Sequence, residues 1–253
     1  APDFNSAIIF SKLNAIEFLG KLLYASILHI NKMNDLKDFY EKNINKNLHK
    51  WKHYFDIYEE NFSRFRKKKI TILEIGVFRG GSLLMWQNYF APQTNIIGID
   101  INPICKQYEN ENIKIYIGDQ SDENFLKSVL DQNNNPDIII DDGGHTSNQQ
   151  ISSFNFLYEN LNPGGIYLVE DTHTSYSREF QDGEDQLTFI EYAKCLSDEL
   201  NDWYRVKNYR SYEQKIDEVD VSYWAKNIYK ISFYNSIVVF EKRKSEIPFS
   251  VIK

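Results

Sequence analysis

The sequence contains little cysteine, which argues against a fold held together by disulfides or by a cysteine-bound metal. Its 253 residues include two cysteines, Cys105 and Cys195, whose separation matches neither a pair of metal ligands nor a disulfide framework. Cysteine use of this kind agrees with a reducing compartment, and we expect the protein in the cytoplasm. The fold must therefore depend on a hydrophobic core and not on covalent cross-links.

Long apolar runs and an excess of positive charge are also missing. No stretch reaches the roughly 18 apolar residues of a membrane span, and the nearest, residues 15–30, carries Glu17, Lys21 and His29. The formal net charge is −7, so the chain lacks the basic field of proteins that bind nucleic acid. We expect neither a membrane span nor a nucleic-acid partner. The chain begins at Ala1 without a signal-peptide pattern, and a lost preceding segment stays an open alternative.

The N-terminal part has the pattern of helices. Within residues 6–65 apolar side chains recur every three or four positions, as at Ile9, Leu13 and Ile16, which predicts amphipathic helices. Residues 32–47 predict a second helix or a loop, and residues 53–65 predict a third helix. We assign residues 1–68 to a helical extension and residues 69–253 to the main domain, without dividing the chain into parts that fold independently.

After this extension the pattern changes to strands that alternate with helices. The strand-like runs cover residues 70–77, 94–102, 113–119, 136–142 and 164–171, and the helical stretches cover residues 81–90, 121–133 and 147–162. These strands lack polar alternation, which is typical of a doubly wound α/β fold whose mostly parallel sheet is covered on both faces. Residues 229–243 predict a hairpin, turning at Tyr234 and Asn235, that adds an antiparallel edge to a sheet of the seven-stranded type.

Acidic residues stand at the ends of the first three strands, where open α/β sheets bind their ligands. Glu74 and Gly76 end the first strand, Asp100 the second and Asp119 the third. Phe78 stands where the dinucleotide fingerprint requires its second glycine, so a pyrophosphate ligand is disfavoured. The ordered set favours S-adenosylmethionine, because a carboxylate such as Asp100 accepts hydrogen bonds from both hydroxyls of a ribose. Each acidic residue alone is equally typical of a helix cap.

More polar residues follow the fourth and fifth strands. Asp142 and His145 come after the fourth strand, and Glu170 and Asp171 after the fifth. Carboxylates this close repel one another unless some are protonated or a cation joins them. Oxygen ligands from Asp142, Glu170 and Asp171 suit Mg²⁺ or another divalent cation, and His145 is placed to act as general base toward an acceptor hydroxyl. Taken singly, these residues also suit a capped turn or a solvated strand end.

The block from Ile70 to Tyr176 resembles a known family. Its segments LEIGVFRGGSLLMW, GIDINP, GDQSD, DIIIDDGGH and NPGGIYLVEDTHTSY are similar to the metal-dependent sugar O-methyltransferases of macrolide biosynthesis, the macrocin and mycinamicin O-methyltransferases, and to a related group labelled cephalosporin hydroxylases. The resemblance implies a Rossmann-like class I methyltransferase fold. It also implies that Asp142, Glu170 and Asp171 hold Mg²⁺ and that His145 is the base.

The resemblance extends to the cofactor, the assembly and the substrate. It implies that S-adenosylmethionine contacts Glu74, Asp100, Asp119 and Gln120. To this set we add Gly76, Ser82 and Asp141. Family members are oligomers whose N-terminal helices help to cover the active site, so we expect a homo-oligomer. The acceptor is expected to be a sugar hydroxyl. Residues 177–229 match nothing in the family, so the acceptor stays open and a macrolide is one possibility. Our preferred acceptor is a nucleotide-linked sugar or a sugar of a bacterial surface polysaccharide, with Tyr176, Trp203 and Trp224 as candidates for stacking on it.

Three other functions remain as alternatives. A metal-independent methyltransferase would use His145 as base without a cation. A non-haem iron hydroxylase would need two histidines and a carboxylate, and His173 would have to join His145. A scaffold that binds S-adenosylmethionine without turnover is disfavoured, because it has no need of carboxylates that repel one another.

Overall fold

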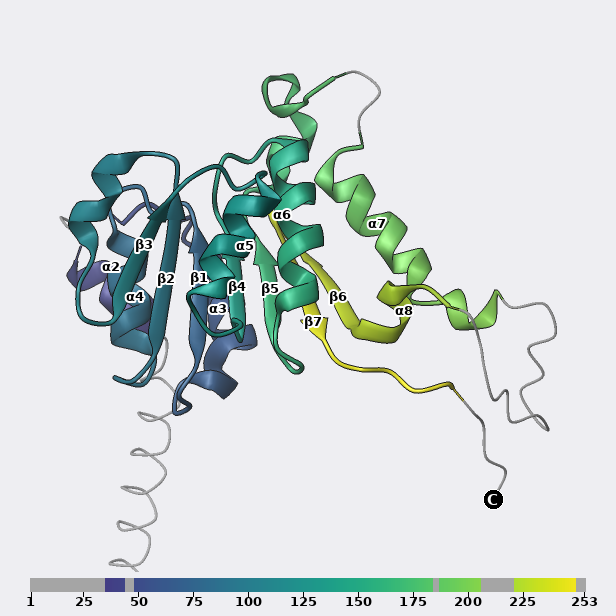
Figure 1. Cartoon of the computed structure of the whole chain (residues 1–253), viewed down its shortest axis with the longest axis horizontal. Helices are drawn as coiled ribbons and strands as arrows, with labels where there is room; N and C mark the ends of the chain where they lie inside the picture. Colours follow the sequence, from purple (N-terminus) through teal and green to yellow (C-terminus); the bar gives the residue numbers. More distant parts are fainter. Residues whose placement is uncertain (1–34, 44–47, 184–186, 206–220, 249–253) are drawn as a thin grey trace, which may run out of the picture.

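The computed structural model describes residues 35–43, 48–183, 187–205 and 221–248, and a seven-stranded sheet forms its centre (Figure 1). The strand order is β3-β2-β1-β4-β5-β7-β6. The strands are β1 (Thr71–Ile75), β2 (Asn95–Asp100), β3 (Ile113–Ile117), β4 (Ile138–Asp141), β5 (Ile166–Val169), β6 (Ile228–Tyr234) and β7 (Ile237–Lys242).

Strands β1 to β5 are parallel, while β7 runs antiparallel to β5 and pairs with β6 as a hairpin. The predicted doubly wound α/β fold with an antiparallel edge is therefore confirmed. The hairpin turns at Asn235 and Ser236, one position later than predicted, and Ser236 has the left-handed φ of 65°. The parallel strands are shorter than predicted because the acidic residues after them already belong to the loops.

The strands β1, β4 and β5 are buried along their whole length, and alternate residues face different helices, whereas Lys114 on the edge strand β3 is exposed. The helices between the strands are α4 (Gly81–Tyr89), α5 (Glu123–Asp131) and α6 (Ser147–Asn160), followed by α7 (Phe189–Glu199) and α8 (Tyr223–Asn227). Ile72 and Ile138 pack in one core with Trp86 of α4, and Leu73 and Ile139 pack in the other with side chains of α5, α6 and α7. Figure 1 shows α5, α6 and α7 in front of the sheet. This alternation explains why the sequence shows no polar face.

The described part of the N-terminal extension packs on the α4 face of the sheet. Helices α2 (Asp35–Lys42) and α3 (Tyr54–Phe62) confirm two predicted helices, and a 3₁₀ turn, η1 (Ser63–Phe65), ends α3. Phe55, Tyr58 and Phe62 of α3 are fully buried, and Tyr58 and Phe62 contact the Trp86 ring. The predicted helix with its apolar positions from Ile9 to Ile27 lies outside the described residues. The boundary at residue 68 stays a prediction, although α3 shares one core with β1.

The remaining helices are short. They are the 3₁₀ helices η2 (Pro103–Tyr108), η3 (Thr172–Tyr176), η4 (Arg178–Phe180) and η5 (Asp202–Tyr204). Across the residues that the structure describes, no helix has the length and hydrophobicity needed to cross a membrane.

Candidate functional site

The parallel pairing brings the predicted residues to one level at the carboxyl edge of the sheet. Ile75 of β1 pairs with Ile99 of β2 and with Asp141 of β4, and Asp141 pairs with Val169 of β5. The residues that follow these partners therefore stand side by side at the edge: Gly76, Asp100, Asp142 and Glu170. Open α/β sheets bind ligands at this edge.

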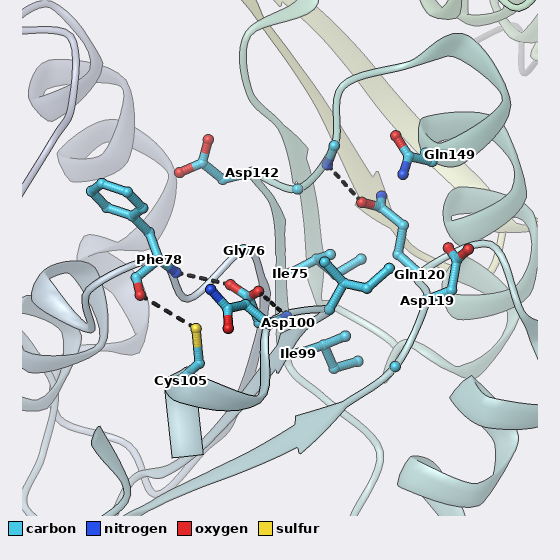
Figure 2. A pocket seen from close by; sticks show the side chains of 15 residues that line it. Ile75, Gly76, Phe78, Ile99, Asp100, Cys105, Asp119, Gln120, Asp142 and Gln149 are labelled. Atoms are coloured by element: carbon cyan, nitrogen blue, oxygen red, sulfur yellow. Dashed lines mark hydrogen bonds between the residues drawn. The ribbon is translucent and has the colours of Figure 1, made fainter. Parts of the chain in front are cut away.

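The loops after β1, β2, β3 and β4 line an open pocket of about 290 Å³, here called the donor pocket (Figure 2). Its walls combine an apolar part, with Ile75 and Ile99, and a polar part. The predicted cofactor residues among its lining are Gly76, Asp100, Asp119 and Gln120.

Asp100 ties two of these loops together. Its Oδ2 accepts hydrogen bonds from the backbone N–H groups of Val77 and Phe78, both at 2.9 Å, and its Oδ1 accepts from Asn102 N at 2.8 Å (Figure 2). A carboxylate has about four acceptor positions, so one remains for a ligand hydroxyl.

Gly76 is needed because of the close approach of two loops. Its φ is +92°, and a Cβ there would lie 1.9 Å from the carbonyl oxygen of Asp142. Only glycine has the conformation and the space for this contact between the β1 and β4 loops.

Three predicted cofactor residues do not line the donor pocket. Glu74 faces the α4 side of the sheet, is fully buried and accepts a hydrogen bond from Trp86 Nε1 at 3.2 Å. Burial raises the pKa of Glu74 to about 7, and the nearby Lys50 ammonium opposes this shift. Ser82 lies in the wall of the second pocket, described below.

Asp141 is the third of these residues, and it stands behind the pocket wall. It is fully buried and accepts hydrogen bonds from Ser153 Oγ at 2.6 Å and from Gln120 Nε2 at 3.1 Å. Gln120 Oε1 in turn accepts from Gly144 N at 2.8 Å. Asp141 thus positions Gln120, which does line the pocket.

A second open pocket of about 310 Å³, here called the acceptor pocket, adjoins the donor pocket. Both are lined by Gly76, Phe78, Asp142 and Gly143. The acceptor pocket also contains the predicted residues His145, Glu170 and Asp171, together with side chains from the N-terminal extension.

His145 owes its position to the start of α6. Thr146 forms a capping box with Gln149 at the helix N-terminus, and the Thr174 hydroxyl donates to the His145 carbonyl at 3.1 Å. The imidazole Nε2 lies 3.8 Å from Asp142 and 3.6 Å from Asp171, so the predicted base is next to both aspartates. Its buried Nδ1 has no hydrogen-bond partner among the described residues, which makes Nε2 the atom available to a substrate.

Backbone strain is concentrated in this pocket. Of the described non-glycine residues, four have positive φ, and three of them line the acceptor pocket: Phe78 at 50°, His145 at 61° and Asp171 at 52°. Such conformations cost free energy and cluster at functional sites, so their gathering here is an independent sign of function.

The sequence reasoning missed Lys50, which lies in the loop before α3. Its ammonium nitrogen is 2.6 Å from Asp142 Oδ2, 2.9 Å from both oxygens of Glu170 and 3.6 Å from Glu74 Oε1. Burial lowers the pKa of Lys50, but the three carboxylates outweigh this and hold it well above its usual value. No sequence motif indicates this lysine, because its partners are distant in the chain.

Two tyrosines of α3 were also missed. Tyr54 donates to Asp171 Oδ1 at 2.6 Å, and Tyr58 donates to Glu170 Oε1 at 2.7 Å. Their spacing of four residues puts both hydroxyls on one face of the helix, a signal that was present in the sequence.

A divalent cation fits part of the predicted ligand set. Asp142, His145 and Asp171 each offer an atom within 4.8 Å of the others, and their side chains are partly exposed. Glu170 is not in this group, and both of its oxygens accept hydrogen bonds from Lys50. His173 is also outside it, since its Nδ1 lies 2.5 Å from Ser236 Oγ. The two-histidine site of an iron hydroxylase is therefore not formed by the described residues.

The aromatic residues proposed for sugar stacking lie elsewhere. Trp203 is buried and donates to Ala225 O, and Trp224 stacks on Phe154 of α6. Neither lines the acceptor pocket, whose tryptophan is Trp51, with 53% of its surface exposed.

The comparisons with known proteins agree with this site. No family model matches the chain. The chain is 38% identical over 157 residues to a rhamnosyl tetracenomycin-C 2'-O-methyltransferase of Streptomyces olivaceus, and 33% identical over 154 residues to the demethylmacrocin O-methyltransferase of Streptomyces fradiae. These matches cover 58% and 56% of this chain, and 41% and 38% of the two relatives. The chain thus spans less than half the length of these curated relatives.

A solved structure supports the same relationship. The MycE methyltransferase of the mycinamycin pathway, in complex with Mg and SAH, superposes with a TM-score of 0.70 at 26% identity, over 83% of this chain and 54% of that one. The sheet and its edge pockets define the Rossmann-like fold of class I S-adenosylmethionine-dependent methyltransferases. More narrowly, the chain is a homologue of the macrocin, mycinamicin and tetracenomycin sugar O-methyltransferases, as its motifs predicted.

Proposed function

We propose that the protein is an S-adenosylmethionine-dependent O-methyltransferase that needs a divalent cation and acts on a sugar hydroxyl. The observation that carries this proposal is the meeting of two pockets at Asp142, one bordered by acidic strand ends and the other by His145 and Asp171. The names of the homologues and the Mg and SAH in the MycE complex support it.

The donor pocket is the proposed site of S-adenosylmethionine. Asp100 offers one free acceptor position to the ribose, and Ile75 and Ile99 offer apolar surface to the adenine. Asp119 and Gln120 complete the polar wall. Glu74, Ser82 and Asp141 stay predictions as cofactor residues, and for Asp141 we favour the supporting contact to Gln120.

The cation is proposed to bind at Asp142 and Asp171. Asp142 lines both pockets, and Asp171 lines the acceptor pocket. When bound, S-adenosylmethionine would supply a methyl group on a positively charged sulfur, and the cation would supply charge that favours a deprotonated acceptor oxygen. Carboxylate ligands with further positions for water and substrate oxygens are typical of Mg²⁺.

His145 is the proposed general base, and Nε2 is the atom that takes the hydroxyl proton. The ring reaches the two aspartates from a backbone in the left-handed conformation, with Nε2 3.8 Å from Asp142 and 3.6 Å from Asp171. Proton transfer to a positioned histidine contributes a factor of about 10²–10⁴ to a rate.

The acceptor is proposed more narrowly as a nucleotide-linked sugar or a sugar of a surface polysaccharide. The homologues are named for sugars attached to antibiotics, which supports a sugar hydroxyl and leaves these glycosides as a second candidate class. Trp51, exposed at the acceptor pocket, offers a flat surface on which a sugar ring can stack. A homo-oligomer and a cytoplasmic location stay predictions.

The test is methyl transfer from labelled S-adenosylmethionine to a panel of nucleotide sugars, surface oligosaccharides and rhamnosyl glycosides, with Mg²⁺ and with EDTA. We expect transfer to one class of sugar that stops with EDTA and returns with added Mg²⁺. Transfer that persists in EDTA would favour the metal-independent alternative. Turnover of S-adenosylmethionine with none of the sugars, but with a phenol or an amine, would contradict the sugar acceptor.

A further inference from the structure

Lys50 occupies the centre of the carboxylate cluster. Its side chain is 2% exposed, and those of its partners Glu74 and Glu170 are 0% and 1% exposed. The same ammonium group also bonds to Asp142, which belongs to both pockets. A cation from the chain itself therefore neutralises part of the cluster that sequence reasoning assigned to a metal ion.

The oxygens of the cluster divide into two groups. Both Glu170 oxygens accept from Lys50, and Oε1 also accepts from Tyr58, so three of about four acceptor positions are used within the protein and the side chain is only 1% exposed. Asp142 turns Oδ2 to Lys50 and Oδ1 toward His145. Asp171 accepts from Tyr54 with Oδ1, and its Oδ2 lies 3.6 Å from His145 Nε2. One oxygen each of Asp142 and Asp171 thus remains for a ligand.

Replacement of Lys50 by a metal ion at Glu170 is unfavourable. The ammonium would lose three carboxylate partners, and the Tyr58 ring, 6.0 Å from it, offers no comparable contact. Removing a partner from a buried ion pair is strongly destabilising, because it leaves a charge in a medium that solvates it poorly. The partly exposed oxygens of Asp142 and Asp171 carry no such penalty.

We infer that Lys50 is a resident cation of this site, that Glu170 serves Lys50, and that the divalent cation is held by Asp142 and Asp171 with water or acceptor oxygens. This inference rests on the cation in the proposed function and narrows its ligand set. Lys50 is a positioning residue: it fixes Asp142 Oδ2 and leaves Oδ1 for the cation. The N-terminal extension, which supplies Lys50, Tyr54 and Tyr58, thereby shapes the cation site.

The experiment is calorimetric titration of Mn²⁺ into the full chain saturated with S-adenosylhomocysteine. The variants are Asp171→Asn and its matched control Glu170→Gln. Each removes one negative charge, and the two positions are adjacent in the sequence. We expect Asp171→Asn to weaken Mn²⁺ binding by about 100-fold, and Glu170→Gln to weaken it by less than about tenfold while lowering the thermal midpoint. Equal or greater weakening by Glu170→Gln would overturn the inference.

The variant Lys50→Met should change the affinity for Mn²⁺ in the opposite direction. It frees Glu170 for the ion, so Mn²⁺ should bind more tightly, and Lys50→Met combined with Glu170→Gln should cancel the gain. Weaker binding in Lys50→Met, with circular dichroism that shows a folded chain, would also overturn the inference. If the wild type binds no Mn²⁺, the divalent cation of the proposed function is contradicted. Binding by Lys50→Met alone would then still support Lys50 as the resident cation. No binding by either protein would overturn the proposed cation and this inference together.

Discussion

The donor pocket and the acceptor pocket share Asp142 but are built in different ways. The donor pocket consists of loops between strands and helices of the sheet, and its residues come from one ordered stretch of chain. The acceptor pocket combines strand ends with residues 48–54 of the N-terminal extension, including Lys50 and Tyr54. In the proposed function the general fold would supply the site for the methyl donor, while an added segment would complete the site that faces the acceptor.

The largest effect that separates the two pockets is expected for His145→Ala. Loss of the base should lower the rate of methyl transfer by a factor of about 10²–10⁴. Affinity for S-adenosylhomocysteine should stay within about twofold, because the imidazole lies outside the donor pocket and only the acceptor side has changed. Single-turnover kinetics and calorimetry on the same preparation check both parts. A loss of cofactor affinity as large as the loss of rate would place His145 in the donor half.

Gly76→Ala should damage the contact between the pockets. The added methyl group meets the Asp142 carbonyl at 1.9 Å, and φ is +92°, so we expect a loss of stability of about 2–4 kcal/mol and weaker S-adenosylhomocysteine binding. Gly183→Ala is the matched control, since no atom of the described residues lies within 4 Å of a Cβ there. Urea denaturation of both variants measures the difference. Equal stabilities would contradict the close approach of the β1 and β4 loops.

A smaller effect is expected on the pH dependence of the free energy of unfolding, through the buried Glu74 carboxyl. Burial raises the pKa of Glu74 from its ordinary value of 4.5 to about 7. The folded state therefore favours the protonated carboxyl, and this stabilising contribution is complete below about pH 4.5, falls as the pH rises toward 7 and is lost above it. Between pH 5 and pH 8 the wild type should lose up to about 3 kcal/mol more stability than Glu74→Gln. A constant difference between the two proteins at both pH values would contradict a neutral Glu74 in the folded state.

The smallest effect is the reactivity of the cysteines. Cys105 lies in the donor pocket wall, and burial raises the pKa of its thiol to about 12, whereas Cys195 is exposed on α7. Iodoacetamide at pH 8 should therefore modify Cys195 first, and S-adenosylhomocysteine should slow only the modification of Cys105. Protection of Cys195, or of neither cysteine, would contradict the position of the ligand.

The same contrast decides what the sequence could predict. Strand order within the chain, hydrophobic runs and acidic strand ends predicted the sheet, the donor pocket and the gathering of Asp142, His145 and Asp171, because parallel strands bring their ends to one edge. Lys50 was not predictable in this way. It reaches Glu170 across 120 positions of sequence, and no local pattern records such a contact. The sequence reasoning considered only charges near in the chain and so left Lys50 out, while the assignment of a divalent ion to Asp142, Glu170 and Asp171 stays a prediction.

Packing decided the positions of several predicted residues, whose roles stay predictions. Glu74 is the second-last residue of β1, and Asp141 is the last residue of β4. Because side chains alternate along a strand, Glu74 points to the α4 face and Asp141 to the α6 face of the sheet, and neither points to the edge. For Trp203 and Trp224 the sequence showed aromatic residues in an unmatched segment and gave no periodic signal of burial. Their packing beside α8 and α6 depends on tertiary contacts.

The measurement that tests the central claim most directly is calorimetric titration of S-adenosylhomocysteine into the wild type and into Asp100→Asn, with and without Mg²⁺. The account predicts micromolar binding to the wild type, with a loss of at least about tenfold in Asp100→Asn, because the amide cannot accept at all the positions of the carboxylate. No binding to the wild type under either condition would contradict the donor pocket, and with it the assignment of a methyltransferase.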